Sequence, residues 1–153
     1  MKRLIQLILV ALVFITCDRT RVFESYHEID PGGWNKDSVV TFTFNIEDTV
    51  QGHNLYIDLR NKGNYPNSNI WLFLSVDSPD GISLSDTIEF TLADPAGRWL
   101  GSGLGDLYDN QFVYRSNVYF PLRGTYMFNI QHGMRSEILE GIRDVGIRVE
   151  KIK

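Results

Sequence analysis

The chain has 153 residues, of which 43% are hydrophobic and 12% aromatic, with 13 glycines and 5 prolines. This length suits one domain, and the composition excludes collagen, low-complexity tracts and disordered chains. The net charge is −4 and becomes −6 without Lys2 and Arg3, so we expect no nucleic-acid partner.

The chain opens with a leader that ends at its single cysteine. Lys2 and Arg3 precede an apolar run over residues 4–15, interrupted only by Gln6. The run is shorter than the roughly 20 residues of a membrane-spanning helix and has the pattern of a secretory signal. Residues 14–17, Phe-Ile-Thr-Cys, resemble a bacterial lipobox. That resemblance implies cleavage before Cys17 and a lipid on its thiol, with acyl chains such as palmitate; the alternatives are an ordinary signal peptide and an uncleaved anchor.

The leader divides the chain into three expected parts. Residues 1–16 form the signal peptide, residues 17–33 the lipidated cysteine with its tether, and residues 34–153 the folded domain. Two or more acyl chains together hold a protein stably on a membrane. An extended tether of about 16 residues reaches at most roughly 50 Å. No acidic run follows Cys17, which favours the periplasmic face of the outer membrane.

The folded part alternates with a period of two residues, which is typical of strands with one buried face. Turn signals containing glycine and proline separate the strands, and seven to nine short strands without crossover helices favour an all-β, antiparallel β-sandwich. Both Ig-like and jelly-roll topologies fit this spacing. Only residues 135–142 have any helical character. The clearest alternating runs are residues 40–46, 55–60, 87–92, 125–130 and 145–150.

Residues 70–76 depart from this alternation. Trp71 and Phe73 occupy the face that is polar in the other strands. The strand is therefore either covered on both sides or presents aromatic rings to a partner.

Sequence motifs give no assembled chemical site. The glycine cluster at residues 101–105 lacks the Lys-Ser/Thr pair of a phosphate loop and a following helix. His27, His53 and His132 are not paired at metal-ligand spacing, and His132 shares the face of the core residues. The acidic turns 77–81 and 106–110 do not fit an EF-hand.

Carboxylates that alternate with apolar residues are typical of a solvent-facing sheet surface, although a hydrolase would need two that converge. The acids considered for that role are Glu47, Asp58, Glu89 and Asp106. We predict no catalytic residue, no cofactor and no metal.

Five segments in their order resemble one known family. They are residues 34–39, 54–61, 95–103, 124–126 leading into 130–135, and 141–146, behind a lipoprotein leader. This order is similar to that of the gliding motility lipoprotein GldH family. The resemblance implies a cell-envelope lipoprotein needed for gliding, with envelope proteins of the gliding machinery as partners and Cys17 as the lipid attachment point. It implies no known biochemical activity.

The leading hypothesis is a lipid-anchored, non-enzymatic β-sandwich that serves as an accessory or scaffold of gliding motility. Trp99, in a turn rich in proline and glycine, is the candidate partner contact; the alternative is that its ring plugs the end of the sandwich. A second hypothesis is a carbohydrate-binding lipoprotein, in which Trp34, Trp71 and Trp99 stack on sugar rings.

Overall fold

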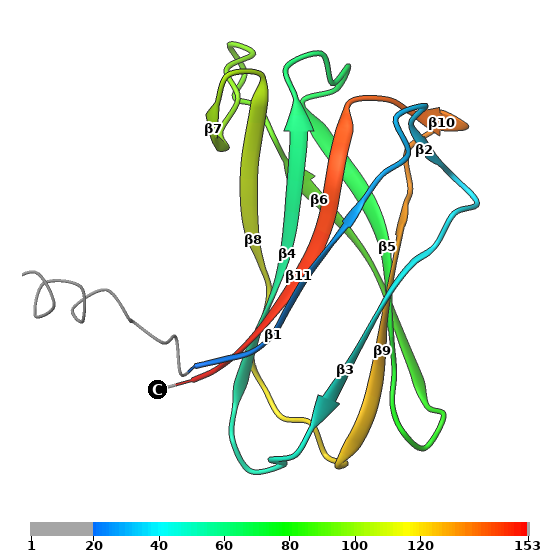
Figure 1. Ribbon diagram of the computed structural model, residues 1–153, viewed down its shortest axis with the longest axis vertical. Helices are drawn as coiled ribbons and strands as arrows, with labels where there is room; N and C mark the ends of the chain where they lie inside the picture. The colour runs from blue at the N-terminus through cyan, green and yellow to red at the C-terminus, as the bar shows by residue number, and fades with distance from the viewer. Residues whose placement is uncertain (1–19, 153) are drawn as a thin grey trace, which may run out of the picture.

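Two antiparallel sheets pack face to face in the computed structural model, which describes residues 20–152 (Figure 1). One sheet has the strand order β1-β11-β4-β8-β7 and the other β3-β9-β5-β6. A two-residue ladder between β10 and β2 closes the upper end. The all-β sandwich predicted from the alternation is confirmed. The strands are β1 (Arg21–Glu28), β2 (Trp34–Asn35), β3 (Val40–Ile46), β4 (His53–Lys62), β5 (Asn69–Asp77), β6 (Ser83–Thr91), β7 (Ser102–Leu104), β8 (Leu107–Val118), β9 (Gly124–His132), β10 (Ile138–Leu139) and β11 (Ile142–Lys151).

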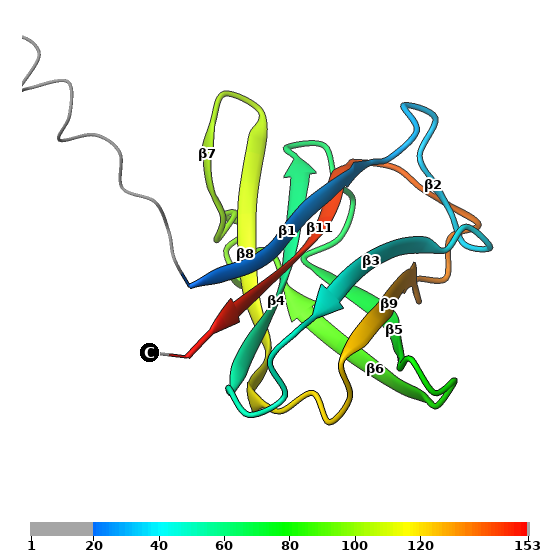
Figure 2. The same cartoon turned by 60° about the horizontal axis from the view of Figure 1, so that its bottom comes forward.

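The order of the long strands distinguishes between the two topologies that the sequence left open. Successive long strands cross from one sheet to the other at every connection except the β5–β6 hairpin, which lies within the four-stranded sheet. Eight long strands in two four-stranded sheets connected in this way form a jelly roll. The short β7 extends the first sheet by pairing with the start of β8. Figure 2 shows the two layers, with β3, β9, β5 and β6 together on one side.

The core lies between the sheets and follows the predicted alternation. In β3 the buried residues are every second one, and the same holds along most of β9. Burial of these apolar faces is the main force that holds the sheets together. The fully buried large side chains include Ile57, Leu59, Leu72, Phe128 and Ile130.

Two expectations about local structure are wrong. The tether expected over residues 17–33 contains strand β1, which pairs with β11 from Arg21 to Glu28. Charged residues and a shift of register after Arg21 hide its alternation, and no residue of β1 is fully buried. The helical character expected at residues 135–142 is absent, because β10 pairs there with β2.

The glycine cluster at residues 101–105 forms one arm of a hairpin rather than a free turn. Gly103 lies so close to the facing strand that a Cβ atom would approach the Leu107 carbonyl oxygen to 1.8 Å. Gly105 has φ 69° at the turn. Close backbone approach and turn geometry explain these glycines without a bound phosphate.

Candidate functional site

The outer face of the four-stranded sheet is the best candidate for a binding surface. Its strands bury one side against the core, so the alternate side chains point away from it. The outward-pointing side chains of these four strands, all within the described residues, include no lysine or arginine. The charged residues in the set are Asp77 and Glu89. The outward-pointing set is Thr41, Thr43, Asn45, Asn69, Trp71, Phe73, Ser75, Asp77, Ser83, Ser85, Thr87, Glu89, Thr91, Thr125, Met127, Asn129 and Gln131.

Two aromatic rings stand exposed on this face. Trp71 is 39% exposed and Phe73 is 47% exposed, although β5 is an inner strand between β9 and β6. The strand is therefore covered on one side only, and the aromatic residues lie on its open side. Phe73 lies over Gly133, where a Cβ atom would come within 3.0 Å of the ring. The missing side chain lets the ring lie low on the sheet.

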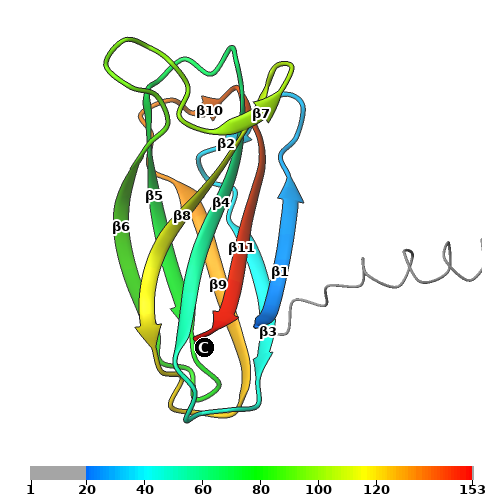
Figure 3. The ribbon, with the colours of Figure 1, turned by 90° about the vertical axis from the view of Figure 1, so that its left-hand side faces the viewer.

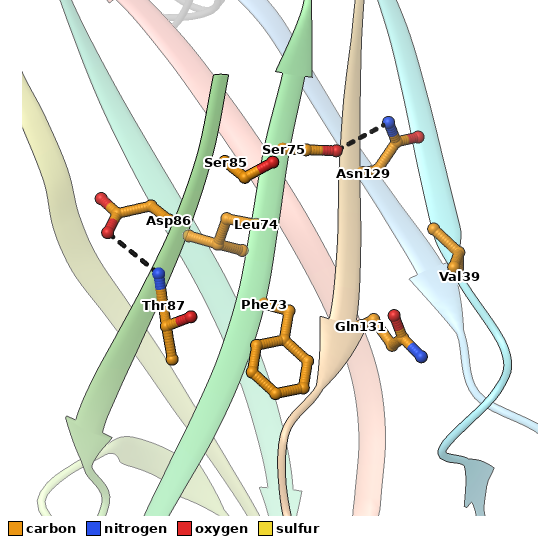
Figure 4. Close-up of a pocket in the computed structure, with 9 residues that line it drawn as sticks. All are labelled: Val39, Phe73, Leu74, Ser75, Ser85, Asp86, Thr87, Asn129 and Gln131. Carbon is orange, nitrogen blue, oxygen red and sulfur yellow. Dashed lines mark hydrogen bonds between the residues drawn. The ribbon is translucent and has the colours of Figure 1, made fainter. Parts of the chain in front are cut away.

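Beside Phe73 the face is hollowed by a shallow depression of about 380 Å³ (Figure 4). Val39, Phe73 and Leu74 supply its apolar lining, and residues with hydroxyl and amide groups from three strands, together with Asp86, supply the rest. Asn129 organises the polar part: its Oδ1 accepts from Thr41 Oγ1 at 2.7 Å, and its Nδ2 donates to Ser75 Oγ at 3.1 Å and to Asp77 Oδ2 at 2.8 Å. The polar side chains are thus held in fixed positions, which lowers the entropy that a ligand or partner must remove.

The other two tryptophans do not form part of this face. Trp34 is 2% exposed, donates from Nε1 to the Ser38 carbonyl at 3.0 Å and packs edge-on against His132. Trp99 is half-buried at the upper end, with ring centroids 6.3 Å from Tyr65 and 5.7 Å from Tyr108. This packing agrees with a ring that closes the end of the sandwich, and the partner contact at Trp99 stays a prediction.

The histidines lie in places that do not form a common site. His132 is buried, with Nε2 3.0 Å from the Trp34 carbonyl oxygen. His53 is also buried and lies edge-on to Phe120, whereas His27 is exposed. Burial lowers the pKa of both His53 and His132, which favours their neutral forms.

The carboxylates considered for hydrolysis or calcium binding are scattered. Asp58 and Glu89 point outward from different sheets, so they cannot flank one substrate. Asp77 accepts from Asn129, Asp80 accepts from the Ile82 amide, and Asp109 pairs with Arg60. Across residues 20–152 no group of three or more His, Cys, Asp or Glu side chains is placed to hold a metal ion.

Asp58 has a feature that the sequence did not reveal. It lies on the outer face of the five-stranded sheet but is only 4% exposed. Gln111 Nε2 donates to its Oδ1 at 2.9 Å, and Tyr26 lies beside it over Gly146. Burial raises the pKa of Asp58, partly opposed by the Gln111 hydrogen bond. Only the register of β1, β11 and β4 shows this burial, since alternation alone places Asp58 in solvent.

Cys17 lies outside the described residues. Within residues 20–152 there is no helix that could span a membrane.

Comparisons with known proteins agree with the resemblance drawn from the sequence. A family model described as GldH lipoprotein matches residues 21–149. The "Gliding motility lipoprotein GldH" of Flavobacterium johnsoniae is 36% identical over 95% of this chain and 94% of its own length. The "Gliding motility lipoprotein GldH homolog" of Christiangramia forsetii is 38% identical over 92% of this chain and 90% of its own.

Solved structures add little to this relationship. The crystal structure of the infectious bursal disease virus VP2 subviral particle is 16% identical to this chain, with a TM-score of 0.38. The aligned region covers 88% of this chain and 33% of the VP2 chain. A likeness this weak supports no statement about function. The match of the family model over most of the chain and the two full-length relatives are decisive, and the chain belongs to the GldH family of gliding motility lipoproteins.

Proposed function

We propose that the protein is a non-enzymatic scaffold of the gliding machinery, anchored by a lipid on Cys17 to the periplasmic face of the outer membrane. Membership of a lipoprotein family and the leader that ends at Cys17 support the anchor. The absence of an acidic run after Cys17 supports the periplasmic face.

The scaffold role is supported mainly by the outer face of the four-stranded sheet. Interface cores are enriched in aromatic residues and depleted of charge, because burying an unpaired charge is costly. Trp71 and Phe73 stand two residues apart on a face with few charges, where Glu89 lies opposite Trp71 and is hydrogen-bonded to Asn69. Hydroxyl and amide groups around them provide hydrogen bonds without a large desolvation cost.

A pull-down from solubilised envelope tests this role. The full chain carrying both Trp71→Ala and Phe73→Ala should retain at least tenfold less of the copurifying proteins than the parent. Val113→Ala is the matched control, since Val113 is also an exposed apolar residue but lies on β8 of the other sheet. Equal retention by the double variant and the parent would contradict the proposal.

The anchor is tested separately by fractionation. Cys17→Ala should move the protein out of the membrane fraction, because the residue that receives the acyl chains is lost. Unchanged fractionation would show that Cys17 does not hold the chain on the membrane.

Carbohydrate binding is the second candidate, and the hollow beside Phe73 is the observation that favours it. Rings flanked by fixed amide and hydroxyl groups suit a sugar, which presents apolar faces and a rim of hydroxyls. Because Trp34 is buried and Trp99 is packed between tyrosines, Trp71 and Phe73 would have to supply the stacking surface. A glycan array should show binding that Trp71→Ala abolishes; an array with no bound glycan would remove this candidate.

A further inference from the structure

The path from Cys17 to the folded domain is short. The Thr20 carbonyl accepts a hydrogen bond from the Lys151 amide at 2.7 Å, and Arg21 already pairs with Glu150. Three peptide units separate Cys17 from Thr20, and each spans at most about 3.6 Å, so the link reaches at most about 11 Å. A lipid on Cys17 would therefore hold the start of β1 close to the bilayer.

The start of β1 lies towards the lower end of the jelly roll, which Figure 3 shows at the bottom. We define the lower end as residues 47–52, 78–84 and 118–123. Three contacts connect it to the start of β1. The Lys151 amide donates to the Thr20 carbonyl, the neighbouring Ile152 amide donates to the Gly52 carbonyl at 2.9 Å, and Gln51 Nε2 donates to the Ile152 carbonyl at 2.7 Å.

The lower end carries a cluster of apolar side chains that the core does not use. A hollow of about 390 Å³ opens between the β5–β6 hairpin and the segment that joins β8 to β9, and its lining is mainly apolar. Ile82, Leu84, Tyr119 and Leu122 line it and are exposed. Val50, on the neighbouring β3–β4 loop, is 83% exposed. Aliphatic residues with a tyrosine are typical of surfaces that sit at the headgroup level of a membrane.

Charges at the lower end favour neither sign strongly. The lower end contains Glu47, Asp48, Asp80 and Arg123, with Lys151 beside it on β11, and Asp48 and Asp80 already accept backbone amides of their own turns. Attraction to a bilayer would therefore come from the apolar side chains rather than from charge, and we expect it to be insensitive to salt.

We propose that the lower end rests on the bilayer, with Ile82, Tyr119, Leu122 and Val50 inserted among the lipid headgroups. This inference rests on the lipid anchor of the proposed function. The jelly roll then stands on the membrane, its upper loops with Trp99 point away, and the outer face of the four-stranded sheet is reached from the side.

Depth-dependent quenching in vesicles tests the orientation. The full chain is expressed with its leader, purified from membranes and placed in vesicles of phosphatidylethanolamine and phosphatidylglycerol that contain brominated lipids. Leu122→Cys and Ile82→Cys carry a fluorescent probe at the lower end. Leu104→Cys is the matched control, because Leu104 is highly exposed in the upper β7–β8 hairpin.

Probes at residues 122 and 82 should be quenched severalfold more than the probe at residue 104, at low and at high salt. Equal quenching at the two ends, or stronger quenching at residue 104, overturns the orientation. The parent chain separates the two proposals, since Cys17 is its single thiol. A thiol reagent that labels the parent shows that the lipid anchor has failed, whereas a protected parent with unquenched lower probes overturns the orientation alone.

Discussion

The two sheets present opposite kinds of outer surface. On the five-stranded sheet, charged side chains are paired with one another: Arg148 contacts Glu24 at 3.1 Å and also Glu150, and Arg60 contacts Asp144 at 3.1 Å and also Asp109. On the four-stranded sheet, mostly uncharged polar groups surround two exposed aromatic rings, and Glu89, which faces Trp71 across the β5–β6 pair, accepts a hydrogen bond from Asn69. A surface whose charges are already paired gains little from a partner, whereas exposed rings among side chains with few charges gain by being covered.

The largest expected effect comes from breaking the ion-pair network of the five-stranded sheet. Arg148→Ala leaves Glu24 and Glu150 without their shared cation in a setting where all three side chains are about four-fifths buried. We expect the free energy of unfolding to fall by about 2 kcal/mol, measured by urea denaturation. Arg98→Ala is the matched control, since this highly exposed arginine pairs with Asp94 and its loss should change stability by less than about 0.5 kcal/mol. Similar effects of the two substitutions would contradict the ranking.

The same network should make stability depend on pH. Burial alone would raise the pKa of Glu24, but hydrogen bonds from Arg21 and Arg148 outweigh it and hold the pKa below its usual 4.5. A lowered pKa contributes stability that is present above pH 4.5 and is lost as the pH falls through the folded-state value. Carboxylates titrate roughly between pH 6 and pH 3, so unfolding should be measured across this range. The acid-induced loss of unfolding free energy should be smaller in Arg148→Ala than in the parent.

A smaller loss of stability is expected where the backbone of β1 lies close against β11. At Gly146 a Cβ atom would lie 2.8 Å from the Ser25 carbonyl oxygen and 2.7 Å from the Tyr26 ring. Gly146→Ala should therefore push β1 away and lower the free energy of unfolding by about 1–2 kcal/mol. Gly97→Ser is a less crowded comparison, because nothing lies within 4 Å of its Cβ position, although its φ of 80° adds backbone strain. An unchanged midpoint for Gly146→Ala would show that the contact yields freely.

Asp58 should respond to pH in the direction opposite to Glu24. Its pKa is raised by burial from the usual 3.8, so its contribution to stability is full below pH 3.8 and is lost as the pH rises through the folded-state value. Asp58→Asn removes the buried charge and keeps the shape and the Gln111 partner. At neutral pH the free energy of unfolding of the variant should equal that of the parent or exceed it by up to about 1 kcal/mol. A clear loss at neutral pH would mean that the ionised carboxylate is needed where it stands.

The smallest change in stability is expected on the aromatic face. Trp71→Ser removes an exposed ring from an inner strand whose buried face is unaltered, so the free energy of unfolding should change by about 0.5 kcal/mol or less. Partner retention should fall in the same variant. A large loss of stability together with lost binding would show that the ring supports the fold rather than a partner.

Sequence reasoning found the features that depend on local pattern. Alternation predicted the core strands, and the two aromatic residues of β5 stood out because they break it. Features that depend on pairing between distant segments were missed: β1 pairs with β11 across more than a hundred residues, and Asp58 is buried because Tyr26 and Gly146 come together only in that register. The edge strand β3 alternates clearly, but β1 has no fully buried residue and so shows no period, and the expected tether concealed a strand.

The ladder between β1 and β11 also determines how the domain would carry tension. Under the proposed anchoring, a force that pulls the domain away from the membrane is opposed by a lipid on Cys17, and the load enters at the start of β1. The pull runs along the strand, whereas the hydrogen bonds of an antiparallel ladder lie across it. The bonds between Arg21 and Glu28 are then sheared together instead of being opened one after another. An edge strand that adds little to the core would thus serve as the mechanical coupling between membrane and domain.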